Sequence, residues 1–138
     1  MAMTAYGISQ YEQAAVKTAS RGQLLILLYE AAIRNVTRAS AAIERRDVAA
    51  KGAAIGKAHA IVDELLFTLD HRVDGEIAAN LERLYDFMAE QLVKANLESS
   101  TRRLHDVQKL LEILLDGFRG AAERASPPAV SGGRGWTS

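Results

Sequence analysis

Histidine and carboxylate side chains are the groups in this sequence whose types could support metal binding or catalysis. The chain of 138 residues holds three histidines and no cysteine, which excludes disulfides, thiolate metal sites and thiol nucleophiles. Helical bundles that hold two metal ions place a glutamate three residues before a histidine. None of His59, His71 and His105 has a glutamate at that spacing. The sequence therefore predicts no metal site and no cofactor.

Phosphoryl transfer through His59 is an alternative function that the sequence leaves open. A phosphotransfer bundle needs a solvated histidine on a helix, and His59 in the stretch Lys57-Ala-His-Ala-Ile-Val-Asp63 faces outward. Asp63 lies one turn further on, where its charge would repel an incoming phosphate. No glycine-rich phosphate loop and no Ser/His/Asp arrangement with a recognisable context occurs. We therefore expect no catalytic residue, no small-molecule substrate and no enzymatic activity.

Composition and charge narrow the class of protein further. Lys and Arg together balance Asp and Glu at 17 each, whereas a nucleic-acid-binding protein usually carries a basic excess. Apolar residues make up 49% of the chain, but no segment has the apolar length needed to span a bilayer. The stretch from Met1 to Gln10 has neither a basic start nor an apolar core, so it lacks a secretion signal. These features predict one globular domain in the cytoplasm, without nucleic acid or membrane insertion.

The first predicted helix, which would position several of the binding residues, begins with a run of apolar residues. Ser20 and Gln23 have the spacing of a helix capping box, and six consecutive large residues follow from Leu24 to Tyr29. A seam for other helices repeats at 4-3-4-3-4 spacing: Leu25, Tyr29, Ala32, Val36, Ala39 and Ile43. At 100° per residue, Leu27 points about 160° away from that seam and Leu24 about 100° away, with Ala31 between them. Another segment or partner must cover these three residues.

Three further helices are expected after a first helix over residues 21–46. Asp47 is the predicted cap of the second, residues 70–75 form a loop, and the third runs over 76–96. Ser99 or Ser100 caps the fourth. The inward residues of the second helix are Ile55, Ala58, Val62, Leu65 and Leu69. Those of the third helix are Ile77, Leu81, Leu84, Met88, Leu92 and Ala95, and those of the fourth are Leu104, Val107, Leu111, Leu114, Phe118 and Ala121. Short connections between long helices predict an all-α, antiparallel up-down-up-down four-helix bundle.

Residues 20–124 make up this predicted bundle, with an N-terminal cap segment over 1–19 and a flexible tail over 125–138. Ile8 and Tyr11 would share a helix face, but their segment is too short to hold a helix unless it docks. Phe67 and Ile113 lie about 160° and about 140° from the seams of their helices. Gly52 and Gly56 weaken the second helix, which suggests either the close approach of another backbone or drift at tolerant surface positions. Trp136 in the tail has no predicted role.

Several stretches of the chain, in order between Tyr6 and Phe118, are similar to those of one protein family. They are Gly7-Ile8-x-x-Tyr11, Val16-x-Thr-Ala-Ser20, Gln23-Leu-Leu-x-x-Leu28-Tyr29, Ala32-Ile33, Lys57-Ala58, Asp74-Gly-Glu-Ile-Ala-x-Asn80-Leu, Leu84-Tyr-Asp-Phe-Met88 and Leu92-x-x-Ala95-Asn96-Leu. In these stretches the chain resembles the flagellar secretion chaperones of the FliS family. It departs from them at Arg21, where the family usually has proline, at Glu30-Ala31 in place of Asp-Gly, and at Phe118 in place of tryptophan.

The resemblance implies a cytoplasmic chaperone that is not an enzyme. It would hold the disordered C-terminal segment of flagellin, which wraps around the bundle in this family, and would prevent premature polymerisation before type III flagellar secretion. Other flagellar regulators or export components are further partners that it allows. The partner-binding residues expected from the residues and the resemblance together are Ile8, Tyr11, Leu24, Leu27, Ala31, Phe67 and Ile113. A structural bundle that dimerises through its outward apolar residues is a second alternative to the chaperone.

Overall fold

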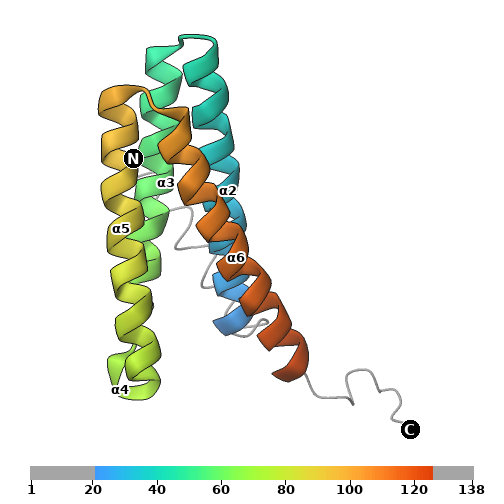
Figure 1. Cartoon of the computed structure of the whole chain (residues 1–138). Coiled ribbons are helices and arrows are strands. Elements are labelled where there is room, and N and C mark those ends of the chain that lie inside the picture. The colour runs from blue at the N-terminus through green and yellow to red at the C-terminus, as the bar shows by residue number, and fades with distance from the viewer. Residues whose placement is uncertain (1–20, 126–138) are drawn as a thin grey trace, which may run out of the picture.

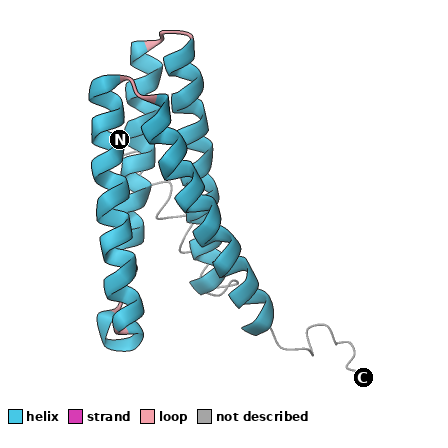
Figure 2. Cartoon of the chain, in the orientation of Figure 1, coloured by secondary structure: helices cyan, strands magenta, loops and turns pink. Residues whose placement is uncertain are grey.

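Five helices make up residues 21–125, the part of the chain that this computed structural model describes (Figure 1). They are α2 (Arg21–Glu44), α3 (Val48–Phe67), the one-turn helix α4 (His71–Asp74), α5 (Glu76–Glu98) and α6 (Thr101–Ala125). Between residues 21 and 125 the chain forms no strand (Figure 2). The prediction of an all-helical chain is confirmed. The predicted cap Ser20, together with Ile8, Tyr11 and Trp136, lies outside the described residues.

The four long helices lie side by side. Helix α2 packs against α3 and α6, and α5 packs against the same two helices from the other side. Successive long helices run in opposite directions along the molecule in Figure 1. Helix α6 begins close to α5 and leans away from it toward the C-terminal end of α6. The two connections α2–α3 and α5–α6 therefore meet at one end of the molecule, and the helices separate toward the other.

Side-chain caps set the helix boundaries at the end where the connections meet. The Oδ1 atom of Asp47 accepts a hydrogen bond of 3.0 Å from the backbone N–H of Ala50, which confirms Asp47 as the cap of α3. The Oγ atom of Ser100 accepts one of 3.2 Å from the N–H of Arg103, so Ser100 rather than Ser99 is the cap of α6. Arg46 has a left-handed φ of 61°, and α2 ends at Glu44, two residues earlier than expected.

The segment expected to be a loop, residues 70–75, contains helix α4. The Oδ1 atom of Asp70 accepts a hydrogen bond of 3.0 Å from the N–H of Arg72, which stabilises the first turn of α4. Gly75 then reverses the chain at a φ of 56°, a conformation that favours glycine. The sequence prediction missed α4 because a single helical turn is too short to show periodicity.

The core follows most of the predicted seams. These seam residues are buried: Leu25, Tyr29, Ala32, Val36, Ala39, Ile55, Ala58, Val62, Leu65, Met88, Leu92, Ala95, Leu104, Val107 and Leu111. Other predicted seam residues are half-buried: Ile43, Leu69, Leu81, Leu84, Leu114 and Phe118. Apolar side chains at helical spacing thus cluster as the pattern predicts.

Two seam positions were predicted wrongly, both where α5 and α6 diverge. The side chain of Ile77, in the first turn of α5, is 66% exposed, and Ala121 near the end of α6 is also exposed. Tyr85 and Leu115 are buried instead. The physical reason is the lean of α6 visible in Figure 1, because a residue on the inward side of a helix is buried only where another helix lies opposite it.

Candidate functional site

The first three turns of α2 hold three of the residues predicted to bind a partner. Leu24, Leu27 and Ala31 are all half-buried, whereas Leu25 and Leu28 beside them are buried. Leu24 and Ala31 pack against the edge of the core. The apolar start of α2 therefore divides into a buried side and a side that keeps part of its surface accessible.

Arg21 fixes this part of α2 against the helices beside it. Its Nη2 atom donates a hydrogen bond of 2.7 Å to the backbone oxygen of Thr68, just after α3. The same atom lies 3.4 Å from the Oδ2 atom of Asp74 in α4. The first described residue of α2 is thus attached to the far end of α3 and to α4, although a cation near a helix N-terminus is unfavourable in itself.

Ring contacts show which sides of α2 face which neighbours. The Tyr29 ring stacks on Phe118 of α6, with 5.4 Å between ring centroids, so the Tyr29 side of α2 faces α6. Leu24 and Ala31 lie on the opposite side at helical spacing. Leu24 and Ala31 therefore lie on the outer part of α2 and keep part of their surface accessible.

Phe67 and Ile113 point outward, as the sequence predicts. Phe67 is the last residue of α3 and its side chain is 88% exposed, while that of Ile113 in α6 is 65% exposed. The ion pair between Arg119 and Glu30 marks the side of α6 that faces α2. Ile113 lies about 120° around the helix from Arg119 and about 160° from the buried Leu111, so it points away from the core. The predicted binding residues therefore lie on more than one side of the molecule and form no single pocket.

The sequence analysis missed an apolar surface between α5 and α6. Phe87, whose side chain is 43% exposed, lies one turn before Gln91, whose Oε1 atom accepts a hydrogen bond of 2.8 Å from Arg103 of α6. Phe87 is thus on the side of α5 that faces α6. We call this surface the α5–α6 face and define it by Leu84, Phe87, Leu110 and Leu114. The available signal was the apolar pair Phe87-Met88, in which only one residue can face inward.

A buried tyrosine pair joins α2 to α5 beneath these surfaces. The hydroxyl groups of Tyr29 and Tyr85 form a short hydrogen bond, and both side chains are almost fully buried. Burial raises the pKa of Tyr29 above its ordinary value, and the negative charge that Tyr85 would carry raises it further. Burial also raises the pKa of Tyr85, against smaller opposing effects of its hydrogen bond to Tyr29 and of the positive charge on Arg21. Both hydroxyls therefore stay protonated in the folded protein.

The described residues show no arrangement typical of a metal centre. Between residues 21 and 125, no group of three or more His, Cys, Asp and Glu side chains could hold a metal ion. The Nδ1 atom of His59 lies 3.3 Å from the Oδ2 atom of Asp63, so the ring of the phosphotransfer candidate already faces a carboxylate. None of the described helices has the combination of length and apolar character that crossing a bilayer requires.

Comparison with known proteins identifies the family. The family model described as flagellar protein FliS matches residues 3–125. The chain belongs to this family. Two relatives in the FliS family are a flagellar secretion chaperone FliS of Salmonella typhimurium strain LT2 and a flagellar secretion chaperone FliSB of Pseudomonas aeruginosa strain PAO1. The first is 38% identical, covering 89% of this chain and 95% of the relative. The second is 37% identical, covering 82% of this chain and 93% of the relative.

The fold agrees with that of a solved structure, described as a crystal structure of a flagellar chaperone from bacteria. It covers 90% of this chain and 99% of its own length at a TM-score of 0.73, with 22% sequence identity. The FliS relatives are named as flagellar secretion chaperones. Membership of the FliS family thus makes this chain a chaperone of flagellar secretion rather than an enzyme.

Proposed function

We propose that this chain binds the disordered C-terminal segment of flagellin in the cytoplasm, prevents its premature polymerisation and aids its type III flagellar secretion. The observation that carries the proposal is the pairing of FliS family membership with large apolar side chains left accessible on several sides of the helices. A compact partner would need one continuous patch. An unfolded segment that wraps around the molecule can use separated apolar positions in turn.

The bundle proposed here is the antiparallel up-down-up-down arrangement over residues 20–124, with a cap segment over 1–19 and a tail over 125–138. In the free protein, Ile8 and Tyr11 of the cap dock over outward apolar residues of the bundle and limit self-association. The flagellin segment displaces the cap. Ordering that segment costs about 2–5 kcal/mol of the gross interaction energy, so the contact must extend over a large surface, including Leu24, Leu27, Ala31, Phe67 and Ile113.

The test is the affinity of the chain for the C-terminal segment of flagellin from the same organism, measured by calorimetry. Leu27→Glu places a charge on a half-buried apolar position, and it should weaken binding by at least about tenfold, because a bound peptide would bury an unpaired carboxylate. Thr37→Glu is the matched control, since Thr37 is an exposed residue of the same helix, and it should leave the affinity within about twofold.

The proposal is contradicted if the unmodified chain does not bind the flagellin segment. Sedimentation at several concentrations separates the dimerising alternative, which predicts a stable dimer that the flagellin segment does not change. Acid-labile phosphate on His59 after incubation with a phosphodonor would instead support the phosphotransfer alternative.

A further inference from the structure

A pocket lies at the end of the molecule where the α2–α3 and α5–α6 connections meet, far from the apolar start of α2. It has a volume of about 360 Å³ and is lined by Ala42, Ile43, Arg46, Asp47, Val48, Lys51 and Ser99. This volume is at the lower end for ligand pockets, enough for the end of a peptide rather than for a large molecule. Nothing in the flagellin-binding proposal above uses it.

Lys51 carries a buried charge beside this pocket without a carboxylate partner. Its side chain is only 8% exposed, and its Nζ atom donates hydrogen bonds of 2.9 Å to the backbone oxygen of Asn96 and to the Oγ atom of Ser99. Both acceptors are neutral, and an ammonium group has three donors. In the part of the chain that the structure describes, Lys51 forms no ion pair. The Asn96 oxygen lies in the last turn of α5, whose negative dipole end offsets part of this charge. The third donor of the ammonium group has no partner among the described residues, and a bound anion would accept it.

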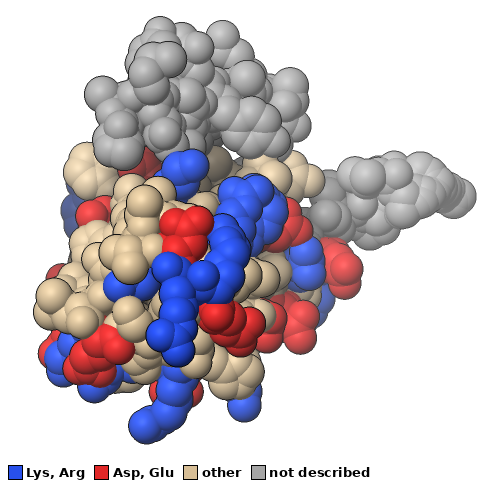
Figure 3. Space-filling view, turned by 90° about the horizontal axis from the view of Figure 1, so that it is seen from above, with Lys and Arg blue, Asp and Glu red and all other residues tan. Residues whose placement is uncertain are grey.

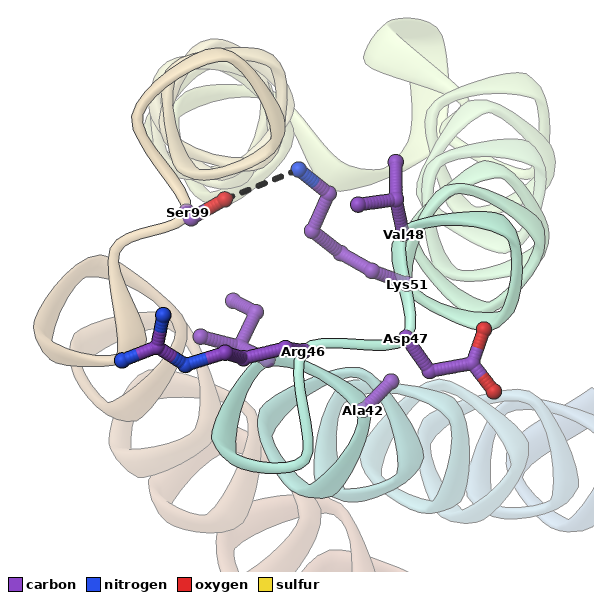
Figure 4. A pocket seen from close by; sticks show the side chains of 7 residues that line it. Ala42, Arg46, Asp47, Val48, Lys51 and Ser99 are labelled. Atoms are coloured by element: carbon purple, nitrogen blue, oxygen red, sulfur yellow. Dashed lines mark hydrogen bonds between the residues drawn. The ribbon is translucent and has the colours of Figure 1, made fainter.

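Arg46 adds a second cation on the same side of the pocket. Its guanidinium group has no ion pair or side-chain hydrogen bond with any residue between 21 and 125. In Figure 4 the guanidinium group of Arg46 and the ammonium group of Lys51 both lie toward Ser99, while the carboxylate of Asp47 points the other way. Asp47 is engaged elsewhere, with the N–H of Ala50 at 3.0 Å and the Nη2 atom of Arg45 at 3.6 Å.

The surroundings of the pocket favour an anion with an apolar attachment. Lysine and arginine side chains form a stripe across this end of the molecule in Figure 3, with aspartate and glutamate side chains on both sides of it. Helix α3 begins here with the positive end of its dipole, while α2 and α5 end here with their negative ends, so the two cations at the pocket rather than the helix dipoles favour an anion. Ala42, Ile43 and Val48 supply apolar walls. A carboxylate carried on a peptide chain end, with a small apolar side chain next to it, combines both properties, and capture of chain-end carboxylates is a known mode of peptide recognition.

We infer that this pocket binds the C-terminal α-carboxylate of the export substrate, through the ammonium group of Lys51 and the guanidinium group of Arg46. The inference rests on the proposed function, in which the bound segment is the C-terminal end of flagellin and therefore ends in a free carboxylate. The chaperone would then recognise the end of the chain itself, in addition to apolar side chains along it.

One outer face of α2 connects the apolar start of the helix to this pocket. Leu27, Ala31, Arg38 and Arg45 follow one another at spacings of four, seven and seven residues, which keeps them on one face. From Leu27 to Glu44, the last residue of α2, the helix rises about 26 Å, a distance that about eight extended residues cover. A segment that contacts Leu27 can therefore place its end in the pocket.

The experiment compares two synthetic peptides with the C-terminal sequence of flagellin from the same organism, one with a free α-carboxylate and one with a C-terminal carboxamide. The free acid should bind the full chain about tenfold more tightly or better, because charge-assisted hydrogen bonds are lost in the amide. Arg46→Gln should remove most of this preference. Arg102→Gln, at an exposed arginine in the first turn of α6 that does not line the pocket, should retain it. Lys51→Met provides a second variant at the pocket.

The outcomes separate this inference from the proposed function. If both peptides bind with equal affinity, the chain-end pocket is wrong and the flagellin proposal stands. If Arg46→Gln weakens both peptides equally, the pocket binds an acidic side chain rather than the chain end, which also overturns the inference. If the preference for the free acid survives both Arg46→Gln and Lys51→Met, the chain end is bound elsewhere. If neither peptide binds the unmodified chain, the proposed function fails first.

Discussion

The buried hydroxyl pair of Tyr29 and Tyr85 is the residue-scale feature that most constrains the core. Each hydroxyl is the other's hydrogen-bond partner, and Tyr29 also stacks on Phe118. Through these contacts, Tyr29 of α2 links its helix to α5 and to α6. A hydroxyl group in this position is favourable only while its partner is present, because an unpaired buried polar group keeps its desolvation cost.

Single replacement of either tyrosine should expose this dependence. Tyr29→Phe and Tyr85→Phe should each lower the free energy of unfolding by about 1–3 kcal/mol, since each leaves one buried hydroxyl without a partner. The double variant should lose clearly less than the sum of the two single losses, because no hydroxyl then remains unpaired. Urea denaturation of the four proteins measures this coupling. Strictly additive losses would show that the two hydroxyls do not depend on each other.

The same pair predicts a loss of stability in alkaline solution. Burial raises the pKa of both Tyr29 and Tyr85 above the ordinary tyrosine value of 10.0. Above about pH 10 these side chains lose protons in the unfolded chain and keep them in the folded one, so the free energy of unfolding falls as the pH rises. Urea midpoints between about pH 8 and pH 11 should decrease, and the decrease should be shallower in the double phenylalanine variant. An equal slope in both proteins would contradict the prediction.

At the scale of the elements, helix α3 carries two glycines that its own fold does not require. A Cβ atom added at Gly52 or Gly56 would meet no atom within 4 Å. The close backbone approach suggested by the sequence is therefore absent among the described residues. Gly75, between α4 and α5, differs because its φ of 56° favours glycine.

Alanine substitutions at these glycines should have opposite effects. Gly52→Ala and Gly56→Ala should each raise the free energy of unfolding by about 1 kcal/mol, the difference in helix propensity between the two residues. Gly75→Ala should lower it, because the added side chain is strained at positive φ. Thermal and urea unfolding measure all three. If the two α3 variants are stable but bind flagellin's C-terminal segment more weakly, a partner approaches α3 at these glycines.

At the scale of the whole molecule, the outward apolar residues lie on separate sides of the helices. Phe67 is at the end of α3, Ile113 is on the outer side of α6, and Leu24 is half-buried on α2. Contiguous apolar patches, rather than scattered residues, mark interaction sites, so a partner that uses these residues must extend over several sides of the molecule. The proposed N-terminal cap covers part of this apolar surface.

Deletion of residues 1–15 should therefore change the behaviour of the whole chain. We expect the truncated protein to associate at lower concentration, because Ile8 and Tyr11 no longer shield apolar surface, and to bind the flagellin segment with altered affinity, because no cap competes with it. Light scattering and calorimetry measure the two effects. A truncated chain that matches the full-length protein in both respects would rule out the cap.

The helical class, the cap at Asp47 and most of the inward seams could be read from the sequence, whereas the sequence narrows the cap of α6 only to Ser99 or Ser100. Each depends on contacts between residues a few positions apart, such as the hydrogen bond from Ala50 to Asp47, and on a helical period that repeats locally. The outward positions of Phe67 and Ile113 follow from the same periodicity. The cap formed by Ile8 and Tyr11 stays a prediction, because both residues lie outside the described part of the chain.

The tertiary structure alone decided how deeply each inward residue is buried and which distant residues meet. The exposure of Ile77 depends on the lean of α6 away from α5, which no local pattern encodes. The Tyr29–Tyr85 pair joins residues 56 positions apart, and Lys51 meets Ser99 across 48. Such pairings depend on the angle and depth at which whole helices pack. The sequence therefore determines the helices and their apolar faces, while their packing determines the buried pair and the cationic pocket.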